Sequence, residues 1–404
     1  MSDSTPQPSA PAPLSRRRAL IPVFVTVLLD LIGFGMIIPL MPYYGLTFHV
    51  SPILVAWLFA SFSLTQLLFA PPLGRLSDRF GRRPVLLLTI IGSICAYTLF
   101  AFAPSFAWLL VARSLAGAAA ANYGIAQAYV ADVTPPAERS KAMGMVIGAA
   151  FGLGFTLGPF MGGELMKLGP KVVPLTAAGL GLVNLAAALL WLKESLPPEV
   201  RGQVKGAWFE LRSLVRTWRN PPVRGLMLLT FLVIFCFAMM ETSLTLYCLA
   251  RFKFDGHQTG MLFGYIGIIL ILVQGGLIGP LVKRFGERRL ILQSILIMAA
   301  GLAVLPLSGN PWLLLPGLTL LALGSGLHNP SSLGLLSLLT DPSEQGGTSG
   351  IYRSYGALAR VFGPLTGSLL FQTVSIRSPF WAAAGLMLMA FVLGWNLLRR
   401  LTVG

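Results

Sequence analysis

The sequence predicts an all-α integral membrane protein, with twelve transmembrane helices in two six-helix, pseudo-symmetric bundles around a central cavity. Three observations support this class: composition, the number of long apolar runs, and an internal repeat. Of the 404 residues, 55% are hydrophobic and only 11% are charged, with a mean hydropathy of +0.76. A soluble globular protein carries roughly 25% charged residues. The chain therefore lacks the polar surface of a water-soluble protein.

Glycine, proline or charged residues separate twelve apolar runs, each near the roughly 20 residues that span a bilayer as a helix. The runs cover about residues 19–41, 53–73, 85–103, 106–131, 142–166, 172–192, 223–249, 259–281, 290–308, 311–339, 347–373 and 379–398. Strands of an outer-membrane barrel alternate apolar and polar residues over about ten positions. Unbroken runs exclude that class.

The formal net charge of +16 follows from lysine and arginine residues that cluster in alternate gaps between the runs. If the N-terminus is cytoplasmic, 22 of the 30 basic residues lie on the cytoplasmic side, counting Arg224 at the start of the seventh run, and 5 lie in outer loops. Cytoplasmic loops of membrane proteins carry such an excess. The pattern predicts a multi-pass protein of the cell (inner) membrane with both termini in the cytoplasm. The positive charge then needs no nucleic-acid partner.

Two segments repeat at one offset of 205 residues. GRLSDRFGRRPVLL at 74–87 aligns with GPLVKRFGERRLIL at 279–292, and GPFMGG at 158–163 aligns with GPLTGS at 363–368. Two matches at a shared offset indicate duplicated six-helix units, and parallel repeats that face a central cavity are typical of transporters.

The repeat divides the chain into four parts. They are a disordered cytoplasmic leader (1–18), an N-terminal six-helix bundle (19–193), a cytoplasmic linker (194–222) and a C-terminal six-helix bundle (223–404). In the linker, Trp208, Leu211, Val215 and Trp218 fall on one helical face. An amphipathic helix of this kind is expected to lie on the inner leaflet.

Several motifs carry a family resemblance. GRLSDRFGRRP, between the second and third runs, resembles the signature loop of the major facilitator superfamily. DLIGFGMIIPLMP, RSLAG, DVTPPAERSKAMG and GLGFTLGPFMGG resemble motifs of its twelve-helix drug:proton antiporter branch, which includes the tetracycline exporters. The resemblance extends along nearly the whole chain. It implies the major facilitator fold and export that is coupled to protons.

The signature loop is a candidate gate. Its gating residues are predicted to be Gly74, Asp78, Arg79, Gly81, Arg82 and Arg83. Asp78 can accept hydrogen bonds from a neighbouring helix N-terminus, and the arginines can pair with carboxylates or anionic lipid. Such a latch would stabilise the state that is closed to the cytoplasm. For Arg82 and Arg83, a role in topology alone is an equal alternative.

The fifth run contains glycines at intervals of four residues. Gly158 and Pro159 belong to GLGFTLGPFMGG, which resembles the motif that is taken to seal the cavity against leak in the antiporter branch. Glycines at this spacing let another helix approach closely, and the proline can bend the helix. They are predicted to contribute to gating, against the alternative of ordinary close packing.

Charged residues inside the runs are candidates for proton coupling, since each costs roughly 2.5 to 3.5 kcal/mol in a bilayer. Asp30 lies near the middle of the first run and Glu241 occupies a similar place in the seventh. Either could take up a proton in one state and release it in another. Arg113, in the fourth run, does not titrate, so it would tune a carboxylate or hold an anion. A fixed ion pair between Asp30 and Arg113 is the alternative to a carrier role.

Polar residues in the remaining runs are predicted to bind substrate. They are Asn122, Gln127, His328, Asn329, Arg353 and Arg360. Arg353 and Arg360 are seven residues apart on one helical face, which would favour an anionic or zwitterionic substrate. Arg353 could instead extend to the membrane surface. His328 lies beside Pro330, at an expected helix break, and a simple hydrogen-bonded role is preferred for it.

These features predict a proton-coupled antiporter that exports amphiphilic small molecules or drugs by alternating access. A carrier of organic anions or of a specific metabolite is the alternative, followed by a non-transporting receptor or a lipid-moving protein. No enzymatic motif, cofactor or metal site is expected, because the usual signatures are missing. The expected partners are a small-molecule substrate, protons and the lipid bilayer, with the chain acting as a monomer.

Overall fold

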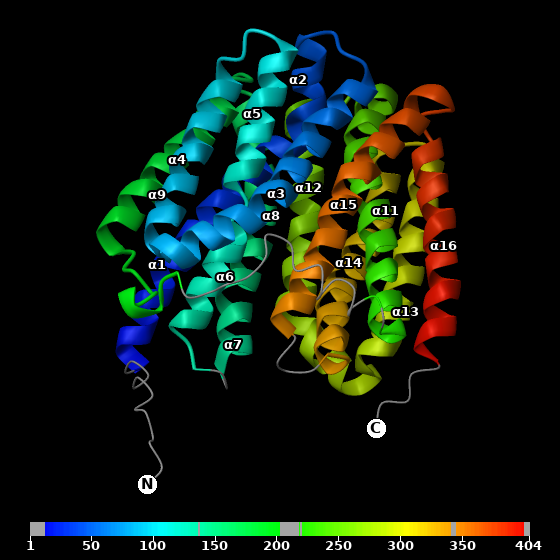
Figure 1. Ribbon diagram of the computed structural model, residues 1–404. Coiled ribbons are helices and arrows are strands. Elements are labelled where there is room, and N and C mark those ends of the chain that lie inside the picture. The colour runs from blue at the N-terminus through cyan, green and yellow to red at the C-terminus, as the bar shows by residue number, and fades with distance from the viewer. Residues whose placement is uncertain (1–12, 136–137, 203–217, 219, 341–344, 400–404) are drawn as a thin grey trace.

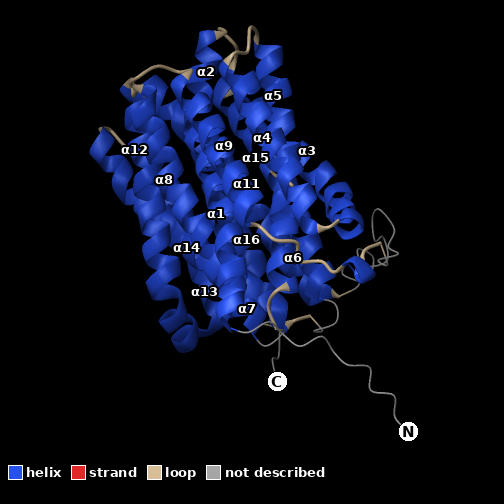
Figure 2. Ribbon diagram, turned by 90° about the vertical axis from the view of Figure 1, so that its left-hand side faces the viewer, coloured by secondary structure: helices blue, strands red, loops and turns tan. Residues whose placement is uncertain are grey.

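Helices form all of the regular secondary structure in the computed structural model, within the part of the chain that it describes (Figure 2). That part excludes residues 1–12, 136–137, 203–217, 219, 341–344 and 400–404. The predicted all-α class is confirmed.

The first half of the chain folds into one group of helices (Figure 1). They are α1 (Pro13–Ile37), α2 (Met41–Thr47), α3 (Pro52–Phe80), α4 (Arg82–Ala101), α5 (Phe106–Ala119), α6 (Asn122–Asp132), α7 (Arg139–Met143), α8 (Ala149–Met166) and α9 (Val172–Trp191). A π-helical turn, Gly144–Gly148, joins α7 to α8.

The second half forms a group of its own (Figure 1). Its helices are α11 (Pro221–Phe252), α12 (Gly256–Leu272), α13 (Ile278–Val304), α14 (Leu314–Leu338), α15 (Gln345–Thr373) and α16 (Ser378–Leu398). A π-helical turn, Val273–Leu277, joins α12 to α13.

Ten segments of the described chain are long and apolar enough to cross a membrane. One of them, Gly256–Leu307, has 52 residues. A straight helix of this length would measure about 78 Å, against about 30 Å of hydrocarbon. Helix α15 is not among the ten and carries Arg353 and Arg360. These findings are consistent with twelve passes.

Two glycines confirm the duplication in three dimensions. Gly81, between α3 and α4, has a φ of +106°, and Gly286, which interrupts α13, has a φ of +76°. The two positions are 205 residues apart, the offset of the sequence repeat. Residues with a side chain rarely adopt a positive φ, so glycine suits both turns.

The boundaries differ from the prediction at the start of the chain. Helix α1 begins at Pro13, so residues 13–18, expected in the disordered leader, are helical, while residues 1–12 lie outside the described part. The amphipathic face predicted in the linker also lies outside it, apart from Trp218. Helix α11 begins at Pro221.

The two halves contact each other mainly through two pairs of helices, α8 with α12 and α3 with α15. A 3₁₀ turn after α1, Ile38–Leu40, also contacts α11 and α12. Helix α1 begins and α16 ends at one end of the bundle, the lower end in Figure 1. We call this the terminal end and the other, where α2 lies, the distal end.

Glycines bring α8 against α1. A Cβ atom at Gly158 would lie 2.8 Å from both the Gly35 Cα and the Ile32 carbonyl oxygen. A Cβ atom at Gly162 would meet the Met36 carbonyl oxygen, and one at Gly154 would lie 2.5 Å from the Leu31 Cβ. Gly154, Gly158 and Gly162, at intervals of four residues, therefore pack closely against α1, as their spacing predicts. Gly148, earlier in the same run, has no atom within 4 Å of such a Cβ.

The close packing at Gly158 and the open space at Gly148 predict different effects of alanine substitutions at the two positions. Gly158→Ala should lower the unfolding free energy by about 1 to 3 kcal/mol, because backbone atoms must move apart. Gly148→Ala, its matched control, should be neutral or stabilising by up to about 1 kcal/mol through helix propensity. Thermal unfolding of the purified variants in detergent measures both, and equal melting temperatures would contradict the packing.

Candidate functional site

The Asp30 carboxylate lies in the first half between two asparagine side chains. Asn122 of α6 donates from Nδ2 to Asp30 Oδ2 at 2.6 Å, and Asn184 of α9 donates from Nδ2 to Oδ1 at 3.2 Å. Asn122 is 7% exposed and Asn184 is fully buried. Sequence reasoning expected Asn122 to bind substrate and did not identify Asn184. The structure places both on Asp30.

A break in the fourth membrane pass positions Asn122. Helix α5 ends at Ala119 and α6 begins at Asn122, which leaves the Ala120 carbonyl oxygen without its usual helical partner. Gln66 of α3 donates to this oxygen from Nε2 at 3.1 Å. Buried backbone groups require such partners, so Gln66 stabilises the break that turns Asn122 toward Asp30.

Arg113 is buried but does not pair with Asp30. Its Nε donates to the Leu58 carbonyl oxygen at 3.2 Å, and its guanidinium lies 4.4 Å from the centre of the Phe62 ring. No ion pair joins Arg113 to Asp30 within the described chain. The fixed pair considered from the sequence is therefore absent.

Tyr97 of α4 connects these two groups. It lies within electrostatic range of both Asp30 and Arg113, and its hydroxyl lies next to Gly33 on α1. A tyrosine in an apolar run gives no sequence signal, so this residue was not predicted. Asp30, Tyr97 and Arg113 form a polar centre inside the first bundle.

The second half has its own buried carboxylate. Glu241 of α11 has one oxygen, Oε1, that is buried without a hydrogen-bond partner. The Arg360 guanidinium of α15 lies within electrostatic range of Glu241 and of Tyr123 in the first half. The two residues predicted from separate runs are thus brought together.

Arg353 connects the two halves. It donates from Nη1 to Gln127 Oε1 of α6, and its guanidinium lies 5.5 Å from the centre of the Tyr123 ring. Arg353 and Arg360 are both exposed, although α15 packs against α3 and α11. Two cations of the second half with solvent-exposed surface thus lie close to residues of the first half. Arg353 does not simply extend to the membrane surface.

His328 and Asn329 do not join this group. Both ring nitrogens of His328 lie 3.2 Å from serine hydroxyls, Nδ1 from Ser294 and Nε2 from Ser332. His328 is 1% exposed, which agrees with the preferred hydrogen-bonded role. Asn329 beside it is half-buried. The helix break expected at Pro330 is wrong, because α14 continues through it to Leu338.

At the distal end the halves are in close contact. The Tyr43 hydroxyl lies 2.6 Å from Thr259 Oγ1 and 2.9 Å from the Phe254 carbonyl oxygen. Glu164 Oε1 of α8 lies 3.3 Å from His257 Nδ1 of α12. Toward the terminal end, the glycines of the two π-helical turns have open space beside them. They are Gly144, Gly148, Gly275 and Gly276. Polar contacts therefore join the halves at the distal end, whereas the two π-helical turns have open space beside them.

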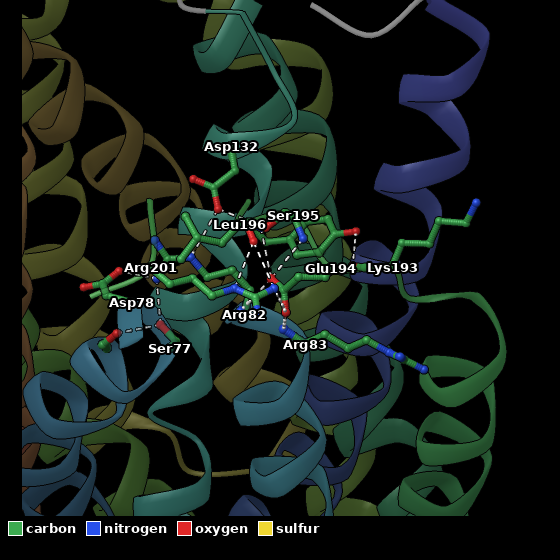
Figure 3. Close-up of polar contacts among 12 residues, drawn as sticks. Ser77, Asp78, Arg82, Arg83, Asp132, Lys193, Glu194, Ser195, Leu196 and Arg201 are labelled. Carbon is green, nitrogen blue, oxygen red and sulfur yellow. Dashed lines mark hydrogen bonds and ion pairs between the residues drawn. The ribbon is translucent and has the colours of Figure 1, made fainter. Parts of the chain in front are cut away.

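The signature loop forms a polar network at the terminal end (Figure 3). Arg82 pairs with Asp78 at 2.5 Å and with Asp132 at 3.2 Å, and it donates to Ser77 Oγ at 2.7 Å. All these residues belong to the first half. Among the described residues, the side chain of Asp78 pairs with Arg82 of its own half, so the predicted latch between the halves stays a prediction.

Glu194, which follows α9, organises the same network (Figure 3). Its carboxylate accepts hydrogen bonds from the backbone N–H groups of Arg82 at 2.8 Å and Arg83 at 3.2 Å, at the start of α4. It also accepts from Ser195 and Leu196, both at 3.0 Å. A carboxylate satisfies unpaired N–H groups and the helix dipole here. The sequence did not identify Glu194, because it is distant from the loop in the chain.

The other predicted gating residues have separate contacts. Arg83 donates from Nη2 to the Leu189 carbonyl oxygen at 2.8 Å. The Arg79 guanidinium lies 5.3 Å from the centre of the Phe80 ring. A side chain at Gly74 would meet no atom within 4 Å, whereas one at Gly81 would meet Glu194. Gly81 therefore leaves room for the carboxylate.

Sequence comparisons identify the family. A profile described as Major Facilitator Superfamily matches residues 23–278 and 275–402. The chain belongs to the Major Facilitator Superfamily. The class C tetracycline resistance protein of Escherichia coli is 32% identical over 359 residues, covering 87% of this chain and 89% of that protein. Multidrug resistance protein 2 of Bacillus subtilis (strain 168) is 31% identical over 363 residues, with 88% and 89% covered.

Solved structures support the same fold for this superfamily member. The crystal structure of the human organic anion transporter MFSD10 (TETRAN) has a TM-score of 0.73 and 28% identity, covering 95% of this chain and all of that one. A bacterial homolog of the human lysosomal transporter Spinster, in an inward-facing and occupied conformation, has a TM-score of 0.80 at 16% identity. It covers 97% of this chain and 98% of that one.

The Glu194 contacts predict a local loss of stability. Glu194→Ala should lower the unfolding free energy by about 0.5 to 2 kcal/mol, since the first N–H groups of α4 lose their acceptor. Glu164→Ala, at the distal end, is the control, because its contacts with Lys167 and His257 are partly exposed and such pairs stabilise little. Melting temperatures in detergent compare the two. A larger loss for Glu164→Ala would be inconsistent with this role of Glu194.

Proposed function

We propose that this superfamily member is a proton-coupled antiporter that exports amphiphilic small molecules or drugs by alternating access. It would act as a monomer in the cell (inner) membrane, without enzymatic activity. The excess of basic residues at the terminal end supports a cytoplasmic location for that end. The tetracycline and multidrug resistance proteins to which the chain is similar support export of drug-like substrates.

The environment of Asp30 is the observation that carries the proposal. Two neutral amides contact this carboxylate, and the nearby cation, Arg113, is engaged elsewhere. Neutral partners allow a carboxyl group to exist in both protonation states, whereas a direct cation would hold it charged. Glu241, with an unpartnered oxygen near Arg360, is the second carrier.

In the proposed cycle, the conformation described above is open toward the cytoplasm. Substrate binds between the halves, where Tyr123, Gln127 and Arg353 meet. The halves then close at the terminal end, where the signature loop acts as the latch, and separate at the distal end. Proton uptake by Asp30 from outside releases the substrate, and the protein returns with the proton.

Transport of organic anions is the second candidate function. The exposed guanidiniums of Arg353 and Arg360 favour an anionic group, because arginine forms charge-assisted hydrogen bonds with carboxylates. The similarity to the human organic anion transporter MFSD10 supports this alternative.

Asp30→Asn tests the proton coupling. In liposomes with an imposed pH gradient and tetracycline as the probe, the wild type should move protons when tetracycline is added. Proton movement by the variant should fall to the level of protein-free liposomes, because the asparagine amide does not take up and release a proton as a carboxylate does. A pH-sensitive dye inside the liposomes reports the movement. Unchanged proton movement in a folded variant would refute Asp30 as a carrier.

Arg360→Ala distinguishes the two candidate substrates. If the substrate is an organic anion, transport of fluorescein should fall about tenfold or more, as expected for one lost charge-assisted hydrogen bond of about 1.5 to 3 kcal/mol. If the substrate is a cationic drug, ethidium transport should continue. Initial rates with the two fluorescent probes decide between them, and equal losses for both would contradict a direct contact with an anion.

A further inference from the structure

We propose that Asn184 is the positioning residue that serves both protonation states of Asp30, by donating to the carboxylate and accepting from the protonated acid. This inference rests on the proposed proton coupling. It assigns to α9 a role that the sequence did not indicate.

The Asn184 amide is only partly satisfied. Its Nδ2 donates to Asp30 Oδ1 at 3.2 Å and to the Thr26 carbonyl oxygen at 3.4 Å. Its Oδ1 is buried without any hydrogen-bond partner, although the side chain is 0% exposed. An unmade hydrogen bond at a buried polar atom costs about 1 to 3 kcal/mol. The amide that contacts the carboxylate therefore has an unused hydrogen-bond acceptor, Oδ1.

A protonated carboxyl group needs such an acceptor. The carboxylate only accepts hydrogen bonds, whereas the acid must also donate one. When a proton from water forms an O–H bond at Asp30 Oδ1, the negative charge is lost. The Nδ2 group of Asn184 is a donor, and it then faces an O–H group that must itself donate. A half-turn of the amide breaks the 3.4 Å bond to the Thr26 carbonyl oxygen and replaces Nδ2 with Oδ1, which accepts the new hydrogen. Release of the proton to water reverses the turn and restores both bonds.

The distances assign this exchange to Asn184 and not to Asn122. The bond from Asn122 to Oδ2 is 2.6 Å long, so this amide is held firmly as a donor. The two bonds from Asn184 are longer and share one nitrogen. They are weaker and more easily exchanged. Oδ2 thus remains the acceptor from Asn122, and the proton binds to Oδ1.

The other groups around Asp30 do not compete for this role. Tyr97 of α4 lies within electrostatic range of the carboxylate. Arg113 of α5 donates its hydrogen bond to the Leu58 carbonyl oxygen and not to Asp30. Thr26 of α1 contributes its backbone carbonyl oxygen to Asn184. Within the described chain, the two asparagines provide the hydrogen bonds to the carboxylate oxygens.

Infrared difference spectroscopy tests the inference without a substrate. Protein labelled with ¹³C at the asparagine side-chain carbonyl is compared at two pH values that protonate and deprotonate Asp30. In the wild type, one labelled carbonyl should shift to lower frequency on protonation, because it gains a hydrogen bond. This shift should be lost in Asn184→Leu, a variant of similar volume, and kept in the matched control Asn122→Leu. Asn184→Ser gives the same comparison if the leucine variant does not fold.

Two infrared bands, that of the Asp30 carboxyl group and that of the labelled asparagine carbonyl, distinguish failure of this inference from failure of the proposed function. The carboxyl band of protonated Asp30 should disappear in Asp30→Asn; if it persists, Asp30 is not the carrier and both proposals fail. If the carboxyl band depends on Asp30 but the labelled asparagine shift is absent from the wild type, or persists in Asn184→Leu, only the role of Asn184 is overturned.

Discussion

A carboxylate inside a helical bundle must have its charge stabilised or removed, and Asp30 is placed so that either is possible. Two amides contact its oxygens, while the nearby guanidinium of Arg113 is bound to a carbonyl oxygen and an aromatic ring. Other features of the first bundle hold the helices around this carboxylate. The break between α5 and α6, the Gln66 contact that stabilises it and the glycine packing of α8 on α1 all keep the surrounding helices in place.

The two halves share an architecture but not a chemistry. Gly81 and Gly286 mark the same turn in each repeat, yet Asp78 in the first copy corresponds to Lys283 in the second. The first half surrounds its carboxylate with amides, whereas the second places Glu241 near Arg360. Duplication thus supplies a symmetric frame for alternating access. In the proposed function both buried carboxylates carry protons, and the arginines of the second half face the substrate.

The sequence was sufficient for the fold, because apolar runs of bilayer length can fold only as spanning helices. It also indicated Asp30, Glu241 and Arg360 as candidate site residues, since charges inside such runs are conspicuous. It did not identify Tyr97, Asn184 or Glu194. Their roles depend on contacts with residues far away in the chain, and a single asparagine or tyrosine in an apolar run is ordinary. The helix break expected at Pro330 was wrong because α14 tolerates the proline, as packed membrane helices often do.

The central claim is that Asp30 exchanges a proton when substrate binds. The most direct measurement is proton release from the purified protein in weakly buffered detergent solution, recorded with a pH electrode as tetracycline is added. The account predicts release by the wild type that is lost in Asp30→Asn while tetracycline still binds. Release of equal size from both proteins would contradict it.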